Sequence, residues 1–175
     1  MHDTGVMSSL IRAPRADELE RLREIERAAG QLFRTERLDA VADDEPFTID
    51  ELSDYLRDGR AWILVDDNVI VGYALVDIVD GAAHLEQLSV LPDHGRRGHG
   101  GALLTHVCEW AAQQGRSTVT LTTFEHVPWN APYYARHGFR VIGDDEIGPE
   151  LQQLREDEAE HGLDPALRVC MCRAV

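Results

Sequence analysis

The feature that most limits what this chain can fold into is a glycine-rich turn between an apolar strand and a helix. Residues 88–104 run Leu-Ser-Val-Leu-Pro-Asp-His-Gly-Arg-Arg-Gly-His-Gly-Gly-Ala-Leu-Leu. Glycines keep large side chains out of such a turn, and the first turn of the following helix has backbone N–H groups without intrahelical partners. The helix dipole and the side chains of Arg96 and Arg97 add positive charge. The segment therefore predicts a cradle for an anion such as a pyrophosphate.

Two common phosphate-binding loops do not fit this turn. A Walker loop ends in Gly-Lys-Ser/Thr, and the chain contains no lysine. A dinucleotide fingerprint needs a third glycine where Leu103 stands. The turn instead resembles motif A of the GCN5-related N-acetyltransferase (GNAT) family, a Gln/Arg-x-x-Gly-x-Gly/Ala turn that binds the pyrophosphate of acetyl-CoA. Here it falls on Gly95 to Gly100, with Gly95 replacing Gln or Arg, so Arg96 or Arg97 is expected to supply the missing side-chain contact.

The resemblance implies that acetyl-CoA is the co-substrate. It places the coenzyme-binding residues on the strand, in the turn and at the start of the helix, with the backbone N–H groups of Leu88 and Val90 donating to the thioester carbonyl and the pantetheine. The expected coenzyme-binding residues of this segment are Leu88, Ser89, Val90, Gly95, Arg96, Arg97, Gly98, His99, Gly100 and Gly101.

A second segment carries the same resemblance. Residues 130–139, Asn-Ala-Pro-Tyr-Tyr-Ala-Arg-His-Gly-Phe, resemble motif B of the family, a helix opened by Asn with Tyr four residues before Gly-Phe. Asn130 is a favoured N-cap, Pro132 suits the first turn, and Gly138 is a natural C-terminal stop, so the helix is expected to be short. The resemblance implies that Asn130 belongs to the coenzyme site and that Tyr134 lies beside the sulfur, as the general acid for the departing thiolate.

The general base is expected on the strand before the turn. His84, Glu86 and Leu88 share one face of that strand, because side chains alternate between faces. Apolar neighbours of Glu86 are expected to raise the pKa of its carboxyl, whereas a histidine such as His84 titrates near neutral pH without help. Glu86 is the predicted base and His84 the alternative. Two further candidates for the general base are a chain of water molecules and a distal glutamate, Glu26 or Glu125.

The net charge of the chain indicates which kind of molecule accepts the acetyl group. The chain has 32 acidic residues against 17 basic ones, and its net charge of −15 disfavours nucleic acid and anionic membranes as partners. An acidic loop containing Asp39, Asp43, Asp44 and Glu45 favours a cationic amine. We expect acetyl transfer to a primary amine of a small molecule by direct attack on the thioester. The alternatives are acetylation of a protein N-terminus or lysine, and a non-catalytic domain that binds or senses acyl-CoA.

No metal is expected. Cys108, Cys170 and Cys172 are expected to be reduced, and no second Cys/His pair stands at zinc-finger spacing. The histidines of the turn, His94 and His99, are interpreted as ordinary loop residues and not as ligands.

The N-terminus lacks a basic-then-apolar signal pattern, and no apolar run approaches the ~18 residues that span a bilayer, so a cytoplasmic location is expected. The family habit of dimerising favours a homodimer.

The predicted fold is α/β (α+β), in the arrangement of the GNAT fold. Residues 1–175 are expected to form a single domain, with a mixed, mostly antiparallel central sheet of about six to seven strands flanked by helices. The resemblance implies that the fourth and fifth strands splay apart, with the pantetheine arm in the gap. Strands are predicted at 9–13, 61–66, 69–80, 83–90, 117–123, 140–142 and 167–173. Helices are predicted from a cap at Asp17 through Leu32, and at 48–59, 98–114, 130–137 and 149–161.

Overall fold

The computed structural model describes residues 9–175, which form two compact units. Unit 1 contains the described residues up to Leu75 together with Gln87–His106, and unit 2 contains Val76–Glu86 and Val107–Val175. Within the described residues, seven strands follow the hydrogen-bonded order β1-β2-β3-β4-β5-β7-β6. The pairs are mostly antiparallel, and β4 and β5 are parallel. The predicted mixed sheet flanked by helices is confirmed.

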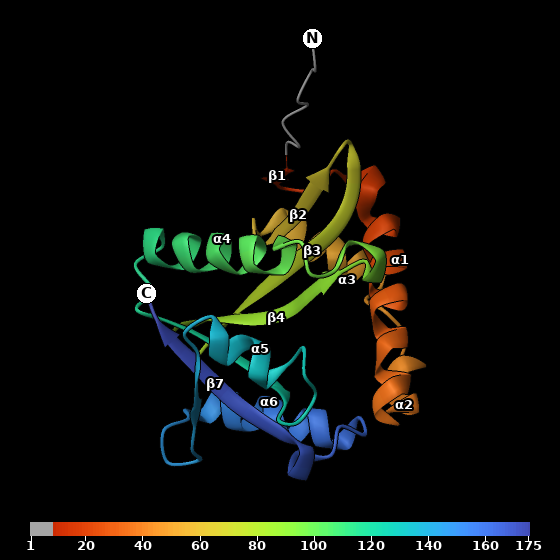
Figure 1. Ribbon diagram of the computed structural model, residues 1–175. Helices are drawn as coiled ribbons and strands as arrows, with labels where there is room; N and C mark the ends of the chain where they lie inside the picture. Colours follow the sequence, from red (N-terminus) through yellow and green to blue (C-terminus); the bar gives the residue numbers. More distant parts are fainter. Residues whose placement is uncertain (1–8) are drawn as a thin grey trace. The chain divides into compact units, whose positions relative to one another are not determined.

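Unit 1 is built on an antiparallel arrangement of β1 (Ser9–Arg12), β2 (Ala61–Asp66) and the first part of β3 (Val69–Val79). Helices α1 (Leu19–Gly30) and α3 (Ile49–Arg57) cover it through apolar side chains at helical spacing (Figure 1). Its buried core consists of Leu19, Leu22, Ile25, Leu52, Ala61, Ile63, Tyr73 and Leu75.

Local sequence accounts for two boundaries of unit 1. Helix α3 begins with the predicted capping box, in which the Glu51 amide donates to Thr48 Oγ1 (3.2 Å) and the Thr48 amide donates to Glu51 Oε2 (2.8 Å). The β2–β3 hairpin turns at Asp67 and Asn68, whose φ values of 46° and 65° suit a two-residue turn. Both features were predicted from short motifs, and both are confirmed.

The predicted start of the first helix was wrong. A 3₁₀ turn, η1 (Ala16–Glu18), precedes α1, and the Asp17 side chain does not cap the helix. Glu18 instead accepts hydrogen bonds from both terminal nitrogens of the Arg12 guanidinium (2.8 and 2.9 Å) and from the Arg15 amide. The Arg12 partner lowers the pKa of Glu18 to about 2. This ion pair connects the 3₁₀ turn η1 to β1, and the α-helix begins only after it, at Leu19.

The end of that helix and the acidic segment also differ from the prediction. Helix α1 ends at Gly30, and Leu32 lies in the 3₁₀ segment η2 (Gln31–Glu36) with 38% of its surface exposed. The acidic loop contains a short helix, α2 (Asp39–Ala42), that was not predicted. Arg34 forms ion pairs with Asp39 and Asp43, so two of the loop's carboxylates already have a cationic partner.

Unit 2 is built on β7 (Arg168–Ala174), which pairs antiparallel with both β5 (Thr118–Phe124) and β6 (Arg140–Ile142). Helices α5 (Ala131–Arg136) and α6 (Pro149–Glu160) complete it (Figure 1). The Asp80 carboxylate in the β3–β4 turn accepts hydrogen bonds from the first amides of α6, at Glu150 (3.0 Å) and Leu151 (2.9 Å). Its core includes Val79, Ile142, Leu151 and Cys170, with Cys172 packed against them.

Three elements run through both units. Strand β3 passes from unit 1 into unit 2 after Leu75. Strand β4 (Ala82–Val90) passes from unit 2 into unit 1 after Glu86, and helix α4 (His99–Gln113) passes from unit 1 into unit 2 after His106. Short 3₁₀ segments η3 (Pro92–His94) and η4 (Pro165–Leu167) precede α4 and β7.

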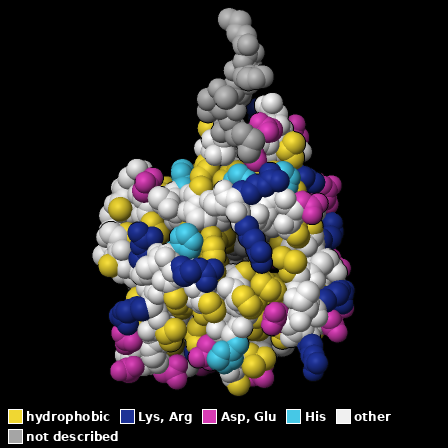
Figure 2. Space-filling model, viewed as in Figure 1, with side chains coloured by type: hydrophobic (Ala, Val, Ile, Leu, Met, Phe, Trp, Pro, Cys, Tyr) yellow, Lys and Arg dark blue, Asp and Glu magenta, His cyan; other side chains and the backbone are white. Residues whose placement is uncertain are grey.

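The cysteines and the surface complete the description. Cys108, Cys170 and Cys172 are free, as expected, and the first two are buried. Acidic and arginine side chains both occur on the face drawn in Figure 2. Of the helices within residues 9–175, none has the length and apolarity needed to span a membrane.

Candidate functional site

The glycine-rich turn begins as a tight, internally bonded segment. The Leu91 amide donates to the Val71 carbonyl (2.8 Å), and the Gly95 amide donates to the Pro92 carbonyl (3.1 Å). After Gly95 the backbone enters the left-handed region at Arg96 (φ 60°) and again at Gly98 (φ 81°). The Gly95 amide is therefore engaged within η3, and the amides available for a ligand come later in the turn.

Helix α4 supplies those amides. Its first backbone hydrogen bond joins the Ala102 amide to the Gly98 carbonyl (2.9 Å), so the amides of residues 99–101 precede the intrahelical series. A Cβ built on Gly98 meets no atom within 4 Å, which means that the backbone faces open space there. Arg96 and Arg97 are exposed beside it. Open space, first-turn amides and two cations fit a pyrophosphate group.

Close backbone packing holds this turn in place. A Cβ on Gly72 of β3 would lie 2.9 Å from the Ser89 carbonyl oxygen and 3.3 Å from Leu103 Cδ1. Only glycine therefore allows β3 to approach β4 and α4 this closely. Ser89 is buried, and its Oγ accepts a hydrogen bond from Gln87 Nε2 (2.8 Å). The strand residues on either side of Ser89 are partly buried.

Glu86 lies in a cluster of ionisable side chains in unit 2. Burial raises the pKa of the Glu86 carboxyl to about 8, and the carboxylates of Asp77 and Glu158 add to the increase, while Arg168 opposes it. The Glu86 side chain still keeps 29% of its surface exposed. The carboxyl is therefore strongly basic for a glutamate.

His84 has a different environment on the same strand. It is 1% exposed, and its Nδ1 lies 2.9 Å from Thr120 Oγ1 on β5. Burial, with a further contribution from the charge of Arg168, lowers the pKa of His84 to about 4. The imidazole is therefore neutral near physiological pH.

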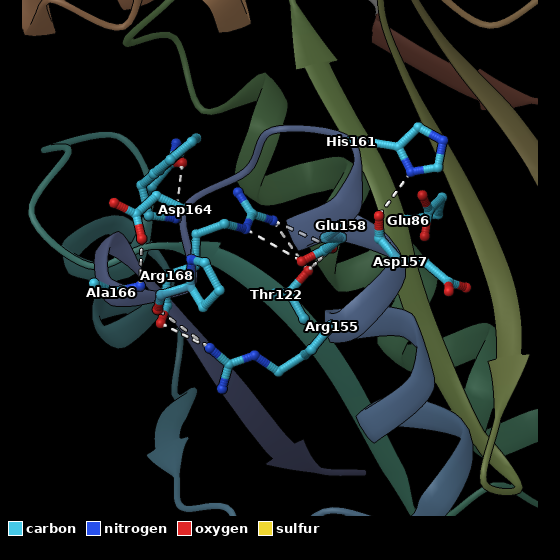
Figure 3. Close-up of polar contacts among 12 residues, drawn as sticks. Glu86, Thr122, Arg155, Asp157, Glu158, His161, Asp164, Ala166 and Arg168 are labelled. Atoms are coloured by element: carbon cyan, nitrogen blue, oxygen red, sulfur yellow. Dashed lines mark hydrogen bonds and ion pairs between the residues drawn. The ribbon is translucent and has the colours of Figure 1, made fainter.

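A partly buried ion pair adjoins this cluster (Figure 3). Arg168 Nε donates to Glu158 Oε2 (3.2 Å) and its Nη2 donates to Thr122 Oγ1 (3.1 Å), while Thr122 donates to Glu158 Oε1 (2.5 Å). The Arg168 guanidinium also stacks over Phe124, 4.7 Å from the ring centroid. Four residues of this region were not predicted from the sequence: Asp77, Thr122, Glu158 and Arg168. Apart from the alternating threonines of β5, no local pattern indicated them.

Tyr134 lies on α5, packed edge-on against Phe139 with ring centroids 5.9 Å apart. Burial raises the pKa of the Tyr134 phenol, Tyr133 adds to the increase and Arg168 opposes it. The phenol is therefore protonated at neutral pH and can donate a proton.

Asn130 occupies the predicted N-cap position of α5, but the prediction that its side chain caps the helix was wrong. Its Oδ1 accepts a hydrogen bond from the Phe124 amide (3.4 Å) at the end of β5. The side chain thus joins the strand to the loop before α5.

The distal glutamates are placed differently from Glu86. Glu26 Oε2 accepts hydrogen bonds from the Tyr73 hydroxyl (2.9 Å) and the Phe47 amide (3.2 Å), and burial raises the pKa of Glu26. The Glu125 side chain is 47% exposed, 3.5 Å from His126 Nε2.

Together, the residues supply three chemical capacities. Unit 1 has an anion cradle, and unit 2 has a carboxyl with a raised pKa and a protonated phenol. Strand β4 carries Glu86 and, directly after it, the segment that leads into the cradle. Such groups can bind a phosphorylated ligand, accept a proton and donate one.

Comparisons with known proteins agree with this chemistry. A family model described as the acetyltransferase (GNAT) family matches residues 19–139. Among solved structures, the PaiA N-acetyltransferase from Thermoplasma acidophilum in complex with coenzyme A has a TM-score of 0.71 at 16% identity, over 97% of this chain and 100% of that one.

Two further structures have related folds. N-acetylglutamate synthase from Neisseria gonorrhoeae, complexed with coenzyme A and N-acetyl-glutamate, has a TM-score of 0.71 at 19% identity over 95% of this chain. The match covers 35% of the synthase, so the chain corresponds to about a third of that protein. The ribosomal-protein-S18-alanine N-acetyltransferase from Escherichia coli has a TM-score of 0.65 at 17% identity, over 96% of this chain and 94% of that one.

Proposed function

Since this chain belongs to the GNAT family of acetyltransferases, we propose that it transfers the acetyl group of acetyl-CoA to a primary amine of a small molecule. The observation that carries the proposal is the raised pKa of Glu86, about 8, in the strand that leads into the pyrophosphate cradle. An alkyl ammonium has a pKa of about 10 and lacks the lone pair that attack requires. A carboxylate of pKa about 8 removes that proton far more readily than an ordinary glutamate does.

The proposed reaction is direct attack of the amine on the thioester. Glu86 accepts a proton from the ammonium, either directly or through water. The amine nitrogen then forms a bond to the acetyl carbon, the bond from that carbon to sulfur breaks, and the nitrogen gives up a second proton to solvent. Tyr134 gives its proton to the departing thiolate and regains one from solvent. Glu86 returns its proton to solvent, so the net products are the N-acetyl amine, coenzyme A and one proton.

In this proposal the coenzyme is held by main-chain and arginine contacts. The amides at the start of α4 and the side chains of Arg96 and Arg97 bind the pyrophosphate. The backbone N–H groups of Leu88 and Val90 donate to the thioester carbonyl, where negative charge develops during attack. The Asn130 side chain accepts a hydrogen bond from the Phe124 amide, so we propose that it positions the loop before α5 in the coenzyme site.

The acceptor class rests on charge. A net charge of −15 and the exposed acidic residues of segment 39–45 favour a cationic amine over an anionic one. The family match includes residues of both units, and we propose that they act as one catalytic domain. A homodimer in the cytoplasm remains our expectation.

The test is coenzyme A release from acetyl-CoA, detected with a thiol reagent. The panel contains polyamines, aminoglycosides, amino acids, arylamines, and peptides with a free N-terminus or a lysine. Release that depends on a small amine supports the proposal. Release of coenzyme A with peptides alone would contradict the small-molecule proposal and show that the acceptor is a protein. Silence across the panel, with acetyl-CoA still raising the melting temperature, supports a non-catalytic coenzyme-binding domain.

A further inference from the structure

Three side chains of unit 1 that the proposed reaction does not use converge beside the glycine-rich turn. Asp66 is the last residue of β2, His94 is the last residue of η3, and His99 is the first residue of α4. One potential ligand atom from each lies within 4.8 Å of the other two. The cluster thus draws its members from three separate elements.

The burial of this cluster is unusual for groups without hydrogen-bond partners. Asp66 is 4% exposed and His99 is 9% exposed. Among the residues that the structure describes, His94 Nδ1 and His99 Nε2 are buried nitrogens without a hydrogen-bond partner. Leaving a buried polar atom without a hydrogen bond destabilises the fold, so two such atoms in one cluster indicate a missing binding partner.

The spacing of two ligand atoms fits a metal ion. His99 Nε2 lies 3.3 Å from Asp66 Oδ2 without a hydrogen bond between them. In a tetrahedral zinc site with bonds of about 2.0–2.1 Å, neighbouring ligand atoms are about 3.3 Å apart. Imidazole nitrogens and a carboxylate oxygen are also ordinary zinc ligands. The pair is therefore already spaced as two vertices of such a site.

We propose that Asp66, His94 and His99 bind a divalent transition-metal ion, with Zn²⁺ as the expected ion, and leave its fourth position to water. His94 and His99 stand on either side of the segment 95–98, which contains Arg96 and Arg97. The ion therefore ties both ends of the arginine turn to the end of β2. This role is structural, and it does not depend on the acetyl-transfer reaction. The sequence did not predict this site, because Asp66 is remote from the two histidines along the chain.

The test measures metal binding by the full chain after removal of metals with a chelator. Zn²⁺ is titrated by calorimetry, and Co²⁺ is used as a spectroscopic probe. We expect one equivalent of Zn²⁺ per chain, a tetrahedral Co²⁺ spectrum without thiolate charge transfer, and a melting temperature that rises with Zn²⁺. His94→Gln and His99→Gln are each expected to weaken Zn²⁺ binding by about tenfold or more.

The matched control is His126→Gln, since His126 is 82% exposed and lies outside the cluster. It is expected to bind Zn²⁺ as the wild type does. His94 is less deeply buried than His99, so His94→Gln tests whether the cluster binds Zn²⁺ even if His99→Gln does not fold. The proposal is overturned if the wild type binds no Zn²⁺, if His94→Gln binds it with unchanged affinity, or if the Co²⁺ spectrum shows thiolate ligation by the cysteines.

Discussion

His84 Nε2 lies 3.8 Å from Glu86 Oε2 on one face of β4, and burial favours the uncharged form of both side chains. It lowers the pKa of His84 to about 4 and raises that of Glu86 to about 8. Near neutral pH the pair therefore carries little charge. As the pH rises, Glu86 ionises while His84 is already neutral, so Glu86 is the member of the pair that titrates in the working range.

The first prediction concerns the pH dependence of the reaction. Because the basic form of Glu86 appears above a pKa of about 8, kcat/KM should rise about tenfold per pH unit below that value and level off above it. Glu86→Gln should lower kcat/KM by about 100-fold or more and abolish the rise, with coenzyme affinity retained. Glu109→Gln, at an exposed residue of α4, is the control, and a normal pH profile in Glu86→Gln would exclude Glu86 as the base.

The second prediction concerns His84 and stability in acid. A histidine whose folded pKa is lowered to about 4 stays neutral in the folded protein, whereas the unfolded chain takes up the proton below about 6.5. Its contribution is therefore present above that pH and is lost as the pH falls toward 4. Between neutral pH and about pH 4.5, the wild type should lose about 2 kcal/mol more unfolding free energy than His84→Asn, measured with urea. Parallel losses in the two proteins would contradict this prediction.

The third prediction concerns the proton given to the leaving group. Tyr134→Phe keeps the ring contact with Phe139 and removes only the hydroxyl, so turnover should fall by about 100-fold while acetyl-CoA affinity stays near the wild-type value. Steady-state kinetics and calorimetry measure the two quantities. Tyr133→Phe is the control and should retain most of its activity. Unchanged turnover in Tyr134→Phe would remove the general-acid assignment.

The fourth prediction concerns the coenzyme cradle. Arg96→Glu and Arg97→Glu should each raise the Kd for acetyl-CoA by about tenfold, because each replaces a cation beside the pyrophosphate with an anion. The wild-type affinity should also decrease as ionic strength increases. Arg57→Glu, a reversal at a residue of α3 with a 70% exposed side chain, is the control. Equal affinities in all three variants would show that neither arginine of the turn contacts the coenzyme.

The fifth prediction concerns the packing behind the cradle. Gly72→Ala should reduce the unfolding free energy by about 1–3 kcal/mol, because the new Cβ would lie 2.9 Å from the Ser89 carbonyl oxygen. Gly30→Ala is the matched comparison, since Gly30 has φ −59° in α1 and a Cβ there approaches only the Ala42 oxygen, at 3.9 Å. It should be neutral or stabilise the protein by about 0.5–1 kcal/mol. Urea unfolding of both variants tests the difference, and equal stabilities would refute the close approach.

The sequence by itself determined the features that depend on neighbouring residues. The capping box of Thr48 and Glu51, the turn at Asp67 and Asn68, and the glycine turn that opens α4 all follow from short-range backbone preferences. For the same reason, the order of strands and helices was recognisable in the chain.

Only the tertiary structure decided the features that join distant segments. The pKa of Glu86 depends on Asp77 from β3 and Glu158 from α6, and the Asn130 side chain bonds to β5 instead of capping α5. The ion pair of Arg12 with Glu18 moved the start of α1, although each residue taken alone has no such signal. Hydrogen bonds, ion pairs and metal ligation act over a few ångströms in space. Which side chains come that close is determined by the packing of whole strands and helices, and local spacing along the chain does not encode it.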